Sequence, residues 1–499
     1  MRAMTAGPGS RSSGSVDAVV VGAGPNGLAA AITLAGAGLK VVLHEAADTV
    51  GGGTRTEELT LPGFRHDVCS AAHPMGLASP FFRAFDLARH GVDLLQPEVA
   101  YAHPLDGGLA GLAYRDLGRT VESLGADGPA WRALFGPLVE RWPDVAELAM
   151  SDLRHLPMRP AAAALLVRRA VEQSSPLHAA RLRSPAGRAL FAGVAGHAFA
   201  PPGSPIAAGV GLVLGTLAHS VGWPVVRGGS QAIADALAKE LGERGGTIVT
   251  GHRVRSLAEL PRARAVLLDV SPTGLTALAG PDLPPGYLRA LRAAPSGAAV
   301  CKVDFALSGP VPWAAAGCDR AGTLHLVGTR EEAIAAERDV ARGKHAVRPY
   351  VLAVQPGVVD PTRAPHGMST LYAYAHVPFG SELDLGEAIT AQVERFAPGF
   401  RDLVLARHVV PAARLAERDL NCVGGGITGG ALSLWRTAMR PVPRWDPYAT
   451  PIEGVYLCSA STPPGPAVHG MCGVHAAARV LRQRFGIRAD PLRFVPNSP

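Results

Sequence analysis

The alternation of apolar and polar stretches is clearest at the start of the chain. Val16 to Val21 is a short β-branched run, which is typical of a strand buried on both faces. It leads into a glycine turn at residues 22–27, and Leu28 to Ala37 then has the Ala, Leu and Ile composition of a helix. A second apolar run, Lys40 to Leu43, leads to Glu45. The pattern predicts a strand, a glycine turn, a helix, a second strand and an acidic residue, in that order.

Each part of this unit has a physical role in binding a dinucleotide. Gly22 permits a tight turn, Gly24 lets the backbone approach a pyrophosphate, and Gly27 allows the helix to pack closely on the strand. The helix N-terminus attracts phosphate, and an acid at the end of the second strand accepts hydrogen bonds from ribose. The alternative is an accidental glycine turn, but the order of the elements favours a cofactor site. We assign to it Gly22, Ala23, Gly24, Pro25, Asn26, Gly27 and Glu45.

Three further segments extend this pattern. A second glycine cluster, Gly51-Gly52-Gly53, precedes Arg55 and indicates another close backbone approach. Ser230 is the expected N-cap of a helix over Gln231 to Arg244, and a strand over Thr247 to Thr250 leads to Val254. Near the C-terminus, a strand at 454–458 and a loop at 459–466 precede a helix that opens near Gly470.

On these motifs the sequence resembles the FAD-dependent superfamily that includes phytoene desaturases, amine oxidases and pyridine nucleotide-disulfide oxidoreductase domain-containing flavoproteins. The resemblance implies that Gly51, Gly52 and Arg55 lie along FAD, with Val254 on its adenine side. It also implies that the last helix points its N-terminus at the flavin, near Ser461, Gly470, Met471 and Cys472. The desaturase-like branch binds FAD noncovalently, so Cys422 and Cys472 are not expected to carry it. Ser461 stands where the amine-oxidase branch often has an acid.

The spacing of these motifs predicts an α/β fold in which a discontinuous, Rossmann-like FAD-binding domain carries an inserted, mixed α+β substrate domain. The FAD-binding domain would consist of residues 16–75, 222–298 and 416–499, and the substrate domain of residues 76–221 and 299–415. Residues 1–15 are expected to be a disordered tail. In the inserted segments we expect helices at 80–90, 130–150, 161–173 and 206–221, and strands at 299–307, 350–355 and 369–376.

Composition and charge narrow the class of protein. The chain has 499 residues and a formal net charge of +7, but it has no long run of like charges, so no nucleic-acid partner is expected. Six widely spaced cysteines show no metal-ligand spacing and indicate reduced thiols in a cytoplasmic protein. The apolar stretch at 206–221 is too short to span a bilayer. A peripheral contact of this stretch with a membrane stays open.

The sequence motifs single out few candidates for catalytic residues. Hydrolase, kinase and zinc-protease motifs are absent from the sequence, so no metal is expected. His469 could border the flavin, although an imidazole that bonds neighbouring backbone is the favoured interpretation. Tyr372 and Tyr374 would share one face of a strand, as substrate wall or as ordinary core. Trp435 could shape the pocket or only pack.

The sequence therefore predicts an FAD-dependent oxidoreductase that takes a hydride from an apolar small molecule, such as an isoprenoid or a secondary metabolite. A second glycine motif for a nicotinamide nucleotide is absent from the sequence, so the electron acceptor is expected to be oxygen, a quinone or a redox protein. Three alternatives stay open at this point: a flavin amine oxidase, an FAD-dependent isomerase, and a non-enzymatic protein that FAD stabilises.

Overall fold

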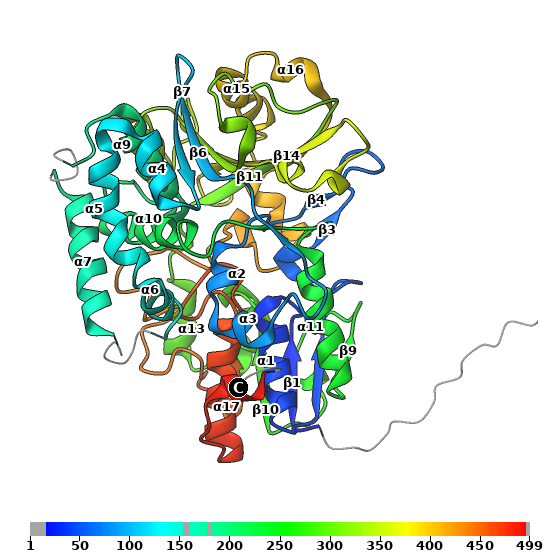
Figure 1. Cartoon of the computed structure of the whole chain (residues 1–499). Coiled ribbons are helices and arrows are strands. Elements are labelled where there is room, and N and C mark those ends of the chain that lie inside the picture. The colour runs from blue at the N-terminus through cyan, green and yellow to red at the C-terminus, as the bar shows by residue number, and fades with distance from the viewer. Residues whose placement is uncertain (1–15, 153–158, 177–180, 496–499) are drawn as a thin grey trace, which may run out of the picture.

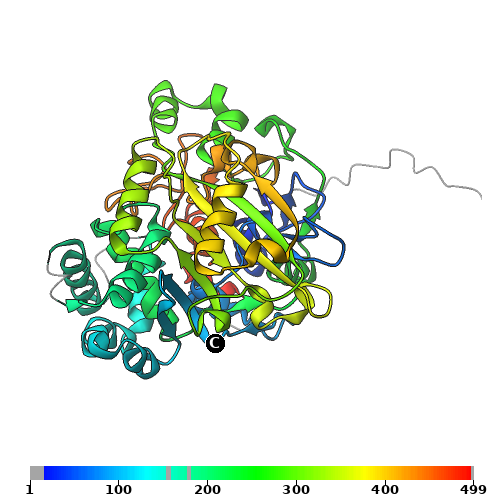
Figure 2. The ribbon, with the colours of Figure 1, turned by 90° about the horizontal axis from the view of Figure 1, so that it is seen from above.

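Two β-sheets organise the computed structural model, which describes residues 16–152, 159–176 and 181–495. A five-stranded parallel sheet lies in the lower half of Figure 1 around β1, and a seven-stranded mixed sheet lies above it around β11 and β14. Figure 2 shows the same molecule from above, with the mixed sheet and the helices above it on the viewer's side. The expected tail, residues 1–15, lies outside the described residues.

The parallel sheet has β1 (Ala18–Val21) at its centre. Its strand order is β16-β10-β1-β2-β9, and every neighbouring pair is parallel. All four side chains of β1 are buried, because helices cover a sheet of this kind on its faces. The Rossmann-like α/β fold predicted from the sequence is confirmed. The other strands are β2 (Val41–His44), β9 (Thr247–Val249), β10 (Ala265–Leu268) and β16 (Val455–Leu457).

Three helices form one layer against this sheet, while α12 (Pro272–Ala279) and α13 (Pro285–Arg292) belong to the cluster that buries its other face. Helix α1 (Pro25–Gly36) begins directly after the first glycines and contacts both α11 (Gln231–Glu243) and α17 (Met471–Phe485). Leu28, Ile32 and Leu34 of α1 are fully buried, as its Ala- and Leu-rich composition predicts. Chain segments more than 400 residues apart thus meet in one layer.

Ser230 is not the side-chain cap expected for α11. Its backbone is already helical and its hydroxyl makes no capping bond. The hydroxyl instead donates to Ser70 O at 2.7 Å and lies 2.8 Å from His73 Nε2. The hydroxyl thus bonds residues that are distant in the chain instead of the N–H groups at the start of α11, so the capping prediction is wrong.

The second sheet has the order β15-β11-β14-β13-β12-β6-β7. All neighbours are antiparallel except β12 and β6, which are parallel. Its long central strands are buried along nearly their whole length. Apolar side chains fill one of their faces, and the other face also carries the buried polar side chains of Lys302, Asp304 and His376. The strands are β6 (Val99–Leu105), β7 (Leu109–Tyr114), β11 (Ala299–Leu307), β12 (Ala321–Leu326), β13 (Val351–Val354), β14 (Ser369–Val377) and β15 (Val404–Val410).

Helices flank the mixed sheet, most visibly α5, α7, α9 and α10 on the left of Figure 1. The stretch expected to form a helix over 206–221 forms α10, which ends at Ala218 and buries most of its residues. The remaining helices are α2 (Pro74–Ala78), α3 (Pro80–Phe85), α4 (Leu117–Ser123), α5 (Gly128–Val139), α6 (Trp142–Ala149), α7 (Pro160–Ser174), α9 (Pro185–Ala195), α10 (Pro205–Ala218), α12 (Pro272–Ala279), α13 (Pro285–Arg292), α14 (Arg330–Ala341), α15 (Gly386–Phe396) and α16 (Phe400–Leu403).

The two sheets draw on different parts of the chain. All five parallel strands come from residues 16–75, 222–298 and 416–499, and all seven mixed-sheet strands come from residues 76–221 and 299–415. A short antiparallel pair, β5 (Leu94–Leu95) with β8 (Val225–Val226), joins the two groups. The exact domain boundaries stay a prediction. Across the described residues, every helix falls short of the length and apolar character that a membrane span requires.

Candidate cofactor and active site

The candidate site begins where the strand order of the parallel sheet reverses. β1 lies between β2 and β10, because the chain adds β2 and β9 on one side of β1 and then β10 and β16 on the other. In open α/β sheets a ligand binds in the crevice beyond the carboxyl ends of the strands at such a point. Residues 22–27 follow β1 directly, and Asp269 follows β10. The fold therefore places the glycine turn and Asp269 on the two sides of the expected crevice.

The close approaches around the glycine turn explain its composition. A Cβ on Gly27 would lie 2.0 Å from Gly22 O, and a Cβ on Gly24 would lie 2.8 Å from Asp269 Oδ2. Gly22 has a φ of +100°, a conformation that side-chain-bearing residues avoid. Larger residues at these three positions would force the turn apart. The turn and the start of α1 thus fit the phosphates of a dinucleotide.

Glu45 is fixed beside the same turn. Its Oε2 accepts a hydrogen bond from Ala23 N–H at 2.7 Å, and its Oε1 accepts one from Ala47 N–H at 2.9 Å. His252 N–H donates to Glu45 O, which brings the segment leading to Val254 alongside. A carboxylate at the end of the second strand fits the hydroxyls of a ribose. The positions of Glu45 and Val254 agree with a ribose role for the first and an adenine-side role for the second, and both roles stay predictions.

The second glycine cluster packs onto the first. Gly51 N–H donates to Ala23 O at 2.8 Å, and a Cβ on Gly52 would lie 3.3 Å from Gly24 Cα. Arg55 donates from Nε to Gly52 O at 3.1 Å, and its guanidinium also bonds Arg418 O. The structure thus brings together Gly51, Gly52 and Arg55 with the first motif, as the sequence predicted for residues lying along one cofactor.

The C-terminal motif closes the site from a third direction. A Cβ on Gly473 would lie 1.9 Å from Asn26 O, and one on Gly470 would lie 2.7 Å from the Phe81 ring. The N-terminus of α17 is therefore held against the N-terminus of α1. Both helices point their partial positive ends toward one region, as the charges on FAD require.

His469 acts on this helix end and not as a free acid or base. Its Nδ1 accepts from Met471 N–H at 3.0 Å, and its Nε2 lies 3.2 Å from Gly465 O. Burial lowers the pKa of His469 to about 4, so the ring is neutral. The interpretation favoured from the sequence, an imidazole bonded to backbone, is the one the structure shows. It also means that Met471 N–H already has a partner within the chain.

Two further predicted site residues, Cys472 in the first turn of α17 and Ser461 in the loop before it, are buried. The Cys472 thiol donates to Gly465 O at 3.4 Å, and burial raises its pKa to about 12. Ser461 is buried and its N–H lies 3.3 Å from Ser459 Oγ. A protonated, hydrogen-bonded thiol is a poor nucleophile, which favours noncovalent cofactor binding.

The aromatic residues considered as site candidates lie in different environments. Tyr372 and Tyr374 lie side by side on β14 with ring centroids 6.0 Å apart, and Tyr372 Oη donates to Cys69 O at 2.6 Å. Both rings are buried and belong to a wall of the mixed sheet. Trp435 is 51% exposed and stacks with Arg436 at 4.4 Å. The structure places Trp435 at the surface, so the pocket-shaping role is not supported.

A buried ionic cluster was missed from the sequence. Lys302 and Asp304 on β11 form an ion pair, with the Lys302 ammonium 4.5 Å from the centre of the Tyr372 ring. His66 Nδ1 lies 3.7 Å from Asp304 Oδ1. The alternation of Lys302 and Asp304 on one strand face was a readable signal, but their pairing with His66, more than 200 residues away, was not.

Asp269 was also missed. Its Oδ2 accepts from Gly27 N–H at 2.9 Å, so its side chain lies inside the glycine turn. Burial, the main cause, and the carboxylates of Asp419 and Glu45 raise its pKa to about 8. The sequence signal was present, since Asp269 follows an apolar run that ends like the run before Gly22.

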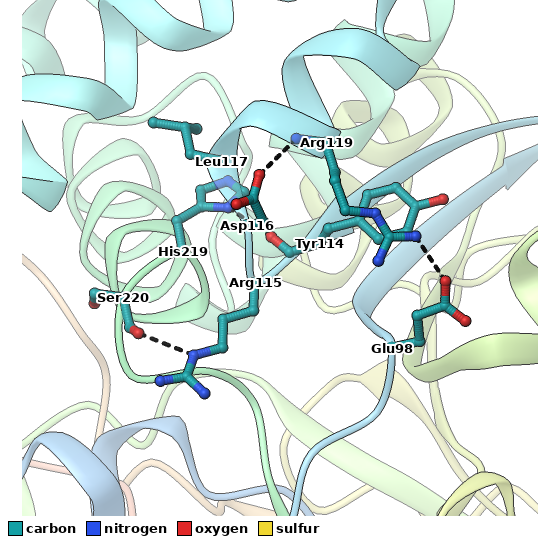
Figure 3. Close-up of a pocket in the computed structure, with 8 residues that line it drawn as sticks. All are labelled: Glu98, Tyr114, Arg115, Asp116, Leu117, Arg119, His219 and Ser220. Carbon is teal, nitrogen blue, oxygen red and sulfur yellow. Dashed lines mark hydrogen bonds and ion pairs between the residues drawn. The ribbon is translucent and has the colours of Figure 1, made fainter.

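A separate surface recess lies in the helical part of the chain (Figure 3). It has a volume of about 490 Å³ and is lined by residues from the end of β7, the start of α4 and the end of α10. Arg119 and Arg115 point around its rim toward Glu98 and Ser220. The predicted site residues are all absent from its lining, so the recess is not the active site. A cluster of three metal-ligating side chains is likewise not found within residues 16–152, 159–176 and 181–495.

The fold and the site define a flavoprotein oxidoreductase of the Rossmann-like class. The model of the family "Flavin containing amine oxidoreductase" matches residues 26–481. The chain belongs to this family, and it is an FAD-dependent oxidoreductase, as predicted.

Individual relatives share between 16% and 35% of their aligned residues with this chain. The chain is 27% identical over 561 aligned residues to "Pyridine nucleotide-disulfide oxidoreductase domain-containing protein 2" of Rattus norvegicus, covering 93% of each protein. It is 35% identical over 108 residues to a limonene dehydrogenase subunit of Castellaniella defragrans, covering 22% of this chain and 19% of that protein. An oxidoreductase from Methanosarcina mazei superposes with a TM-score of 0.61 at 16% identity, over 94% of this chain and 100% of that one. The last similarity concerns the fold alone.

Proposed function

We propose that this enzyme is a dehydrogenase or desaturase that oxidises an apolar small molecule, with an isoprenoid or related hydrocarbon as the substrate class. FAD supplies the chemistry by accepting a hydride from a substrate carbon at its flavin ring. The residues of the chain hold the cofactor, exclude water and position the substrate. Oxygen, a quinone or a redox protein would then take up the electrons.

The observation that carries this proposal is a buried cluster of aromatic and aliphatic side chains on the mixed sheet, against which Cys69, the neighbour of Gly53, also packs. Tyr372, Tyr374 and Leu352 belong to one buried cluster that also contains Ala71 and Cys422. Burial raises the pKa of Tyr374 and of Tyr372 far above the ordinary value, so both hydroxyls stay neutral. Such a wall favours an uncharged, apolar ligand.

A named relative supports the same substrate class. The segment shared with the limonene dehydrogenase of Castellaniella defragrans is 35% identical, and that protein's name refers to a monoterpene hydrocarbon. The aligned part is short, so it supports the proposal without fixing the substrate.

Amine oxidation is the second candidate, because the family description refers to amines. A cationic amine would need a carboxylate or an aromatic cage. The carboxylate of Asp304, next to the tyrosine wall, is already paired with Lys302, and Ser461 offers no charge. These contacts favour the apolar substrate over the amine.

The test is anaerobic bleaching of the flavin absorbance. We expect limonene or a related terpene to reduce the flavin, and we expect putrescine and monoamines to leave it oxidised. Reduction by dithionite in the same cuvette is the control for a competent flavin. Bleaching by amines, with peroxide released in air, would instead establish the oxidase. Reoxidation of the bleached enzyme by air or by a soluble quinone then identifies the acceptor.

A further inference from the structure

Asp269 occupies an unusual place in the cofactor crevice. β10 pairs with β1 in a register that sets Leu268 beside Val21, so Asp269 stands beside Gly22. Its Oδ2 accepts from Gly27 N–H at 2.9 Å and lies 2.8 Å from the point where Gly24 would carry a Cβ. An acidic side chain therefore sits among the backbone groups that a pyrophosphate would approach.

An ionised carboxylate there would oppose cofactor binding. Pyrophosphate is itself negative, and it seeks the same helix N-terminus and backbone N–H groups. A buried charge without a cation partner is also costly. FAD is nonetheless the cofactor of this family, so the Asp269 carboxyl and the pyrophosphate must lie side by side at the glycine turn of residues 22–27.

The surroundings of Asp269 disfavour its ionised form from several directions. Glu45 approaches from the end of β2 and Asp419 from the loop before η10 (Val423–Gly425). Burial, as the main cause, and the carboxylate of Asp269 in turn raise the pKa values of the thiols of Cys458, after β16, and Cys472, on α17. The Arg55 guanidinium acts on the pKa of Asp419, where it opposes the effect of burial. Burial, together with the carboxylates of Asp419 and Glu45, raises the pKa of Asp269 to about 8.

We propose that Asp269 is an FAD-binding residue that works as a neutral carboxylic acid. Oδ2 accepts from Gly27 N–H, and the proton on Oδ1 is donated to a pyrophosphate oxygen. Where Asp269 is ionised in the free protein, binding takes one proton from the buffer, and release of FAD returns it. Cofactor retention is thereby linked to pH through one side chain.

The linkage has a definite sign. Below about pH 8 the acid is already protonated, so FAD affinity does not depend on pH. Above that value the free protein must first take up a proton, and the dissociation constant rises by up to about tenfold per pH unit.

The experiment measures FAD release from the purified holoenzyme and needs no substrate. The holoenzyme is diluted at pH values from 6.5 to 9.5, and free FAD is measured by its fluorescence after ultrafiltration. We expect a constant dissociation constant up to pH 7.5 and an increase of about tenfold or more by pH 9.5.

The key variant is Asp269→Asn, which keeps an acceptor for Gly27 N–H and a permanent donor. It should bind FAD as the wild type does at pH 7 and should lose the alkaline increase. Asp48→Asn, an exposed acid on the same sheet edge, is the matched control and should keep the wild-type profile. If the amide variant does not fold, Asp269→Ser offers another neutral donor and acceptor, with the same flat profile expected.

Two results would overturn the proposal. A wild-type dissociation constant that is flat to pH 9.5 would mean that no proton is linked to binding. An unchanged alkaline increase in Asp269→Asn or Asp269→Ser would mean that another group titrates. Neither outcome bears on the substrate, because flavin bleaching is measured separately.

Discussion

At the scale of single residues, two acids with different environments serve the same crevice. Glu45 accepts hydrogen bonds from two backbone N–H groups at 2.7 and 2.9 Å. Asp269 has one such bond and more burial. Both acids therefore bind backbone N–H groups of the turn at residues 22–27, Glu45 through Ala23 and Asp269 through Gly27.

Replacing Glu45 tests the ribose role. Glu45→Gln removes a charged acceptor, and a hydrogen bond to a charged group is worth about 1.5–3 kcal/mol. We expect FAD affinity to fall by about 10- to 100-fold, measured as FAD released on dilution. Glu58→Gln, at an exposed position directly after β3 (Thr56–Glu57), should retain wild-type affinity. Equal affinity in both variants would remove Glu45 from the site.

The Lys302 and Asp304 pair makes a second prediction at this scale. Burial alone would raise the pKa of Asp304, but the Lys302 ammonium, with His408 and His66, brings it below the ordinary value. Removing one partner of a buried pair leaves an uncompensated charge, at a cost of about 3–5 kcal/mol. Lys302→Met should therefore lower the free energy of unfolding by about that amount at pH 7.

The pH dependence of this variant follows from the same charge. Without Lys302, Asp304 would take up a proton at a higher pH than in the wild type, which relieves the buried charge. The deficit relative to wild type should therefore shrink between pH 7 and pH 5 in urea denaturation. Lys239→Met, whose side chain is 72% exposed, should differ from wild type by less than about 0.5 kcal/mol. A deficit that is equal at both pH values would contradict this account.

At the scale of elements, the contact between α1 and α17 decides whether the site closes. Gly473 lets the two helix starts touch, since its Cβ would lie 1.9 Å from Asn26 O. By contrast, a Cβ on Gly242 in α11 would meet nothing within 4 Å. Close packing therefore requires glycine at position 473, whereas position 242 has room for a larger residue.

These glycines give a matched pair of substitutions. Gly473→Ala should destabilise the protein by about 1–3 kcal/mol through overpacking and should reduce FAD content, since both helix ends lie at the predicted cofactor site. Gly242→Ala should stabilise it by about 0.5–1 kcal/mol, because alanine favours the helix. Thermal unfolding and the ratio of flavin to protein absorbance measure both effects. A neutral Gly473→Ala would show that α17 can shift without loss.

At the scale of the whole molecule, buried histidines dominate the response to acid. Burial is the main cause that lowers the pKa values of His73, His103 and His219 to about 4, from an ordinary value near 6.5. Each ring is neutral in the folded protein and binds a proton in the unfolded chain. The histidines with this shift are His66, His73, His103, His219 and His469.

Stability should therefore fall as the pH decreases from 6.5 toward 4. The unfolded chain binds protons first, so the stability that neutral histidines contribute is complete above pH 6.5 and is lost below it. Each such histidine costs about 2 kcal/mol at pH 5. Urea midpoints measured from pH 7.5 to pH 5 should drop steeply, and the exposed-site variant His366→Gln should drop in parallel. A flat profile would contradict the buried, neutral state of these rings.

Much of the fold could be predicted because its signals are local. The helix expected over residues 231–244 spans Gln231–Glu243, and the strand expected over 299–307 spans Ala299–Leu307. Periodic apolar positions and flanking glycines set these limits within a few neighbouring residues. The Ser230 cap failed for a nonlocal reason, because Ser70 and His73 compete for its hydroxyl.

The sequence by itself determined the glycine turns, the acid at the end of the second strand and the family to which they belong, since each depends on residues close together in the chain. Only the tertiary structure decided that Asp269 enters the turn of residues 22–27, that His469 caps α17, and that Lys302 meets Asp304 beside His66. Such contacts join segments up to about 240 residues apart, and their charge states depend on burial, which no local pattern encodes.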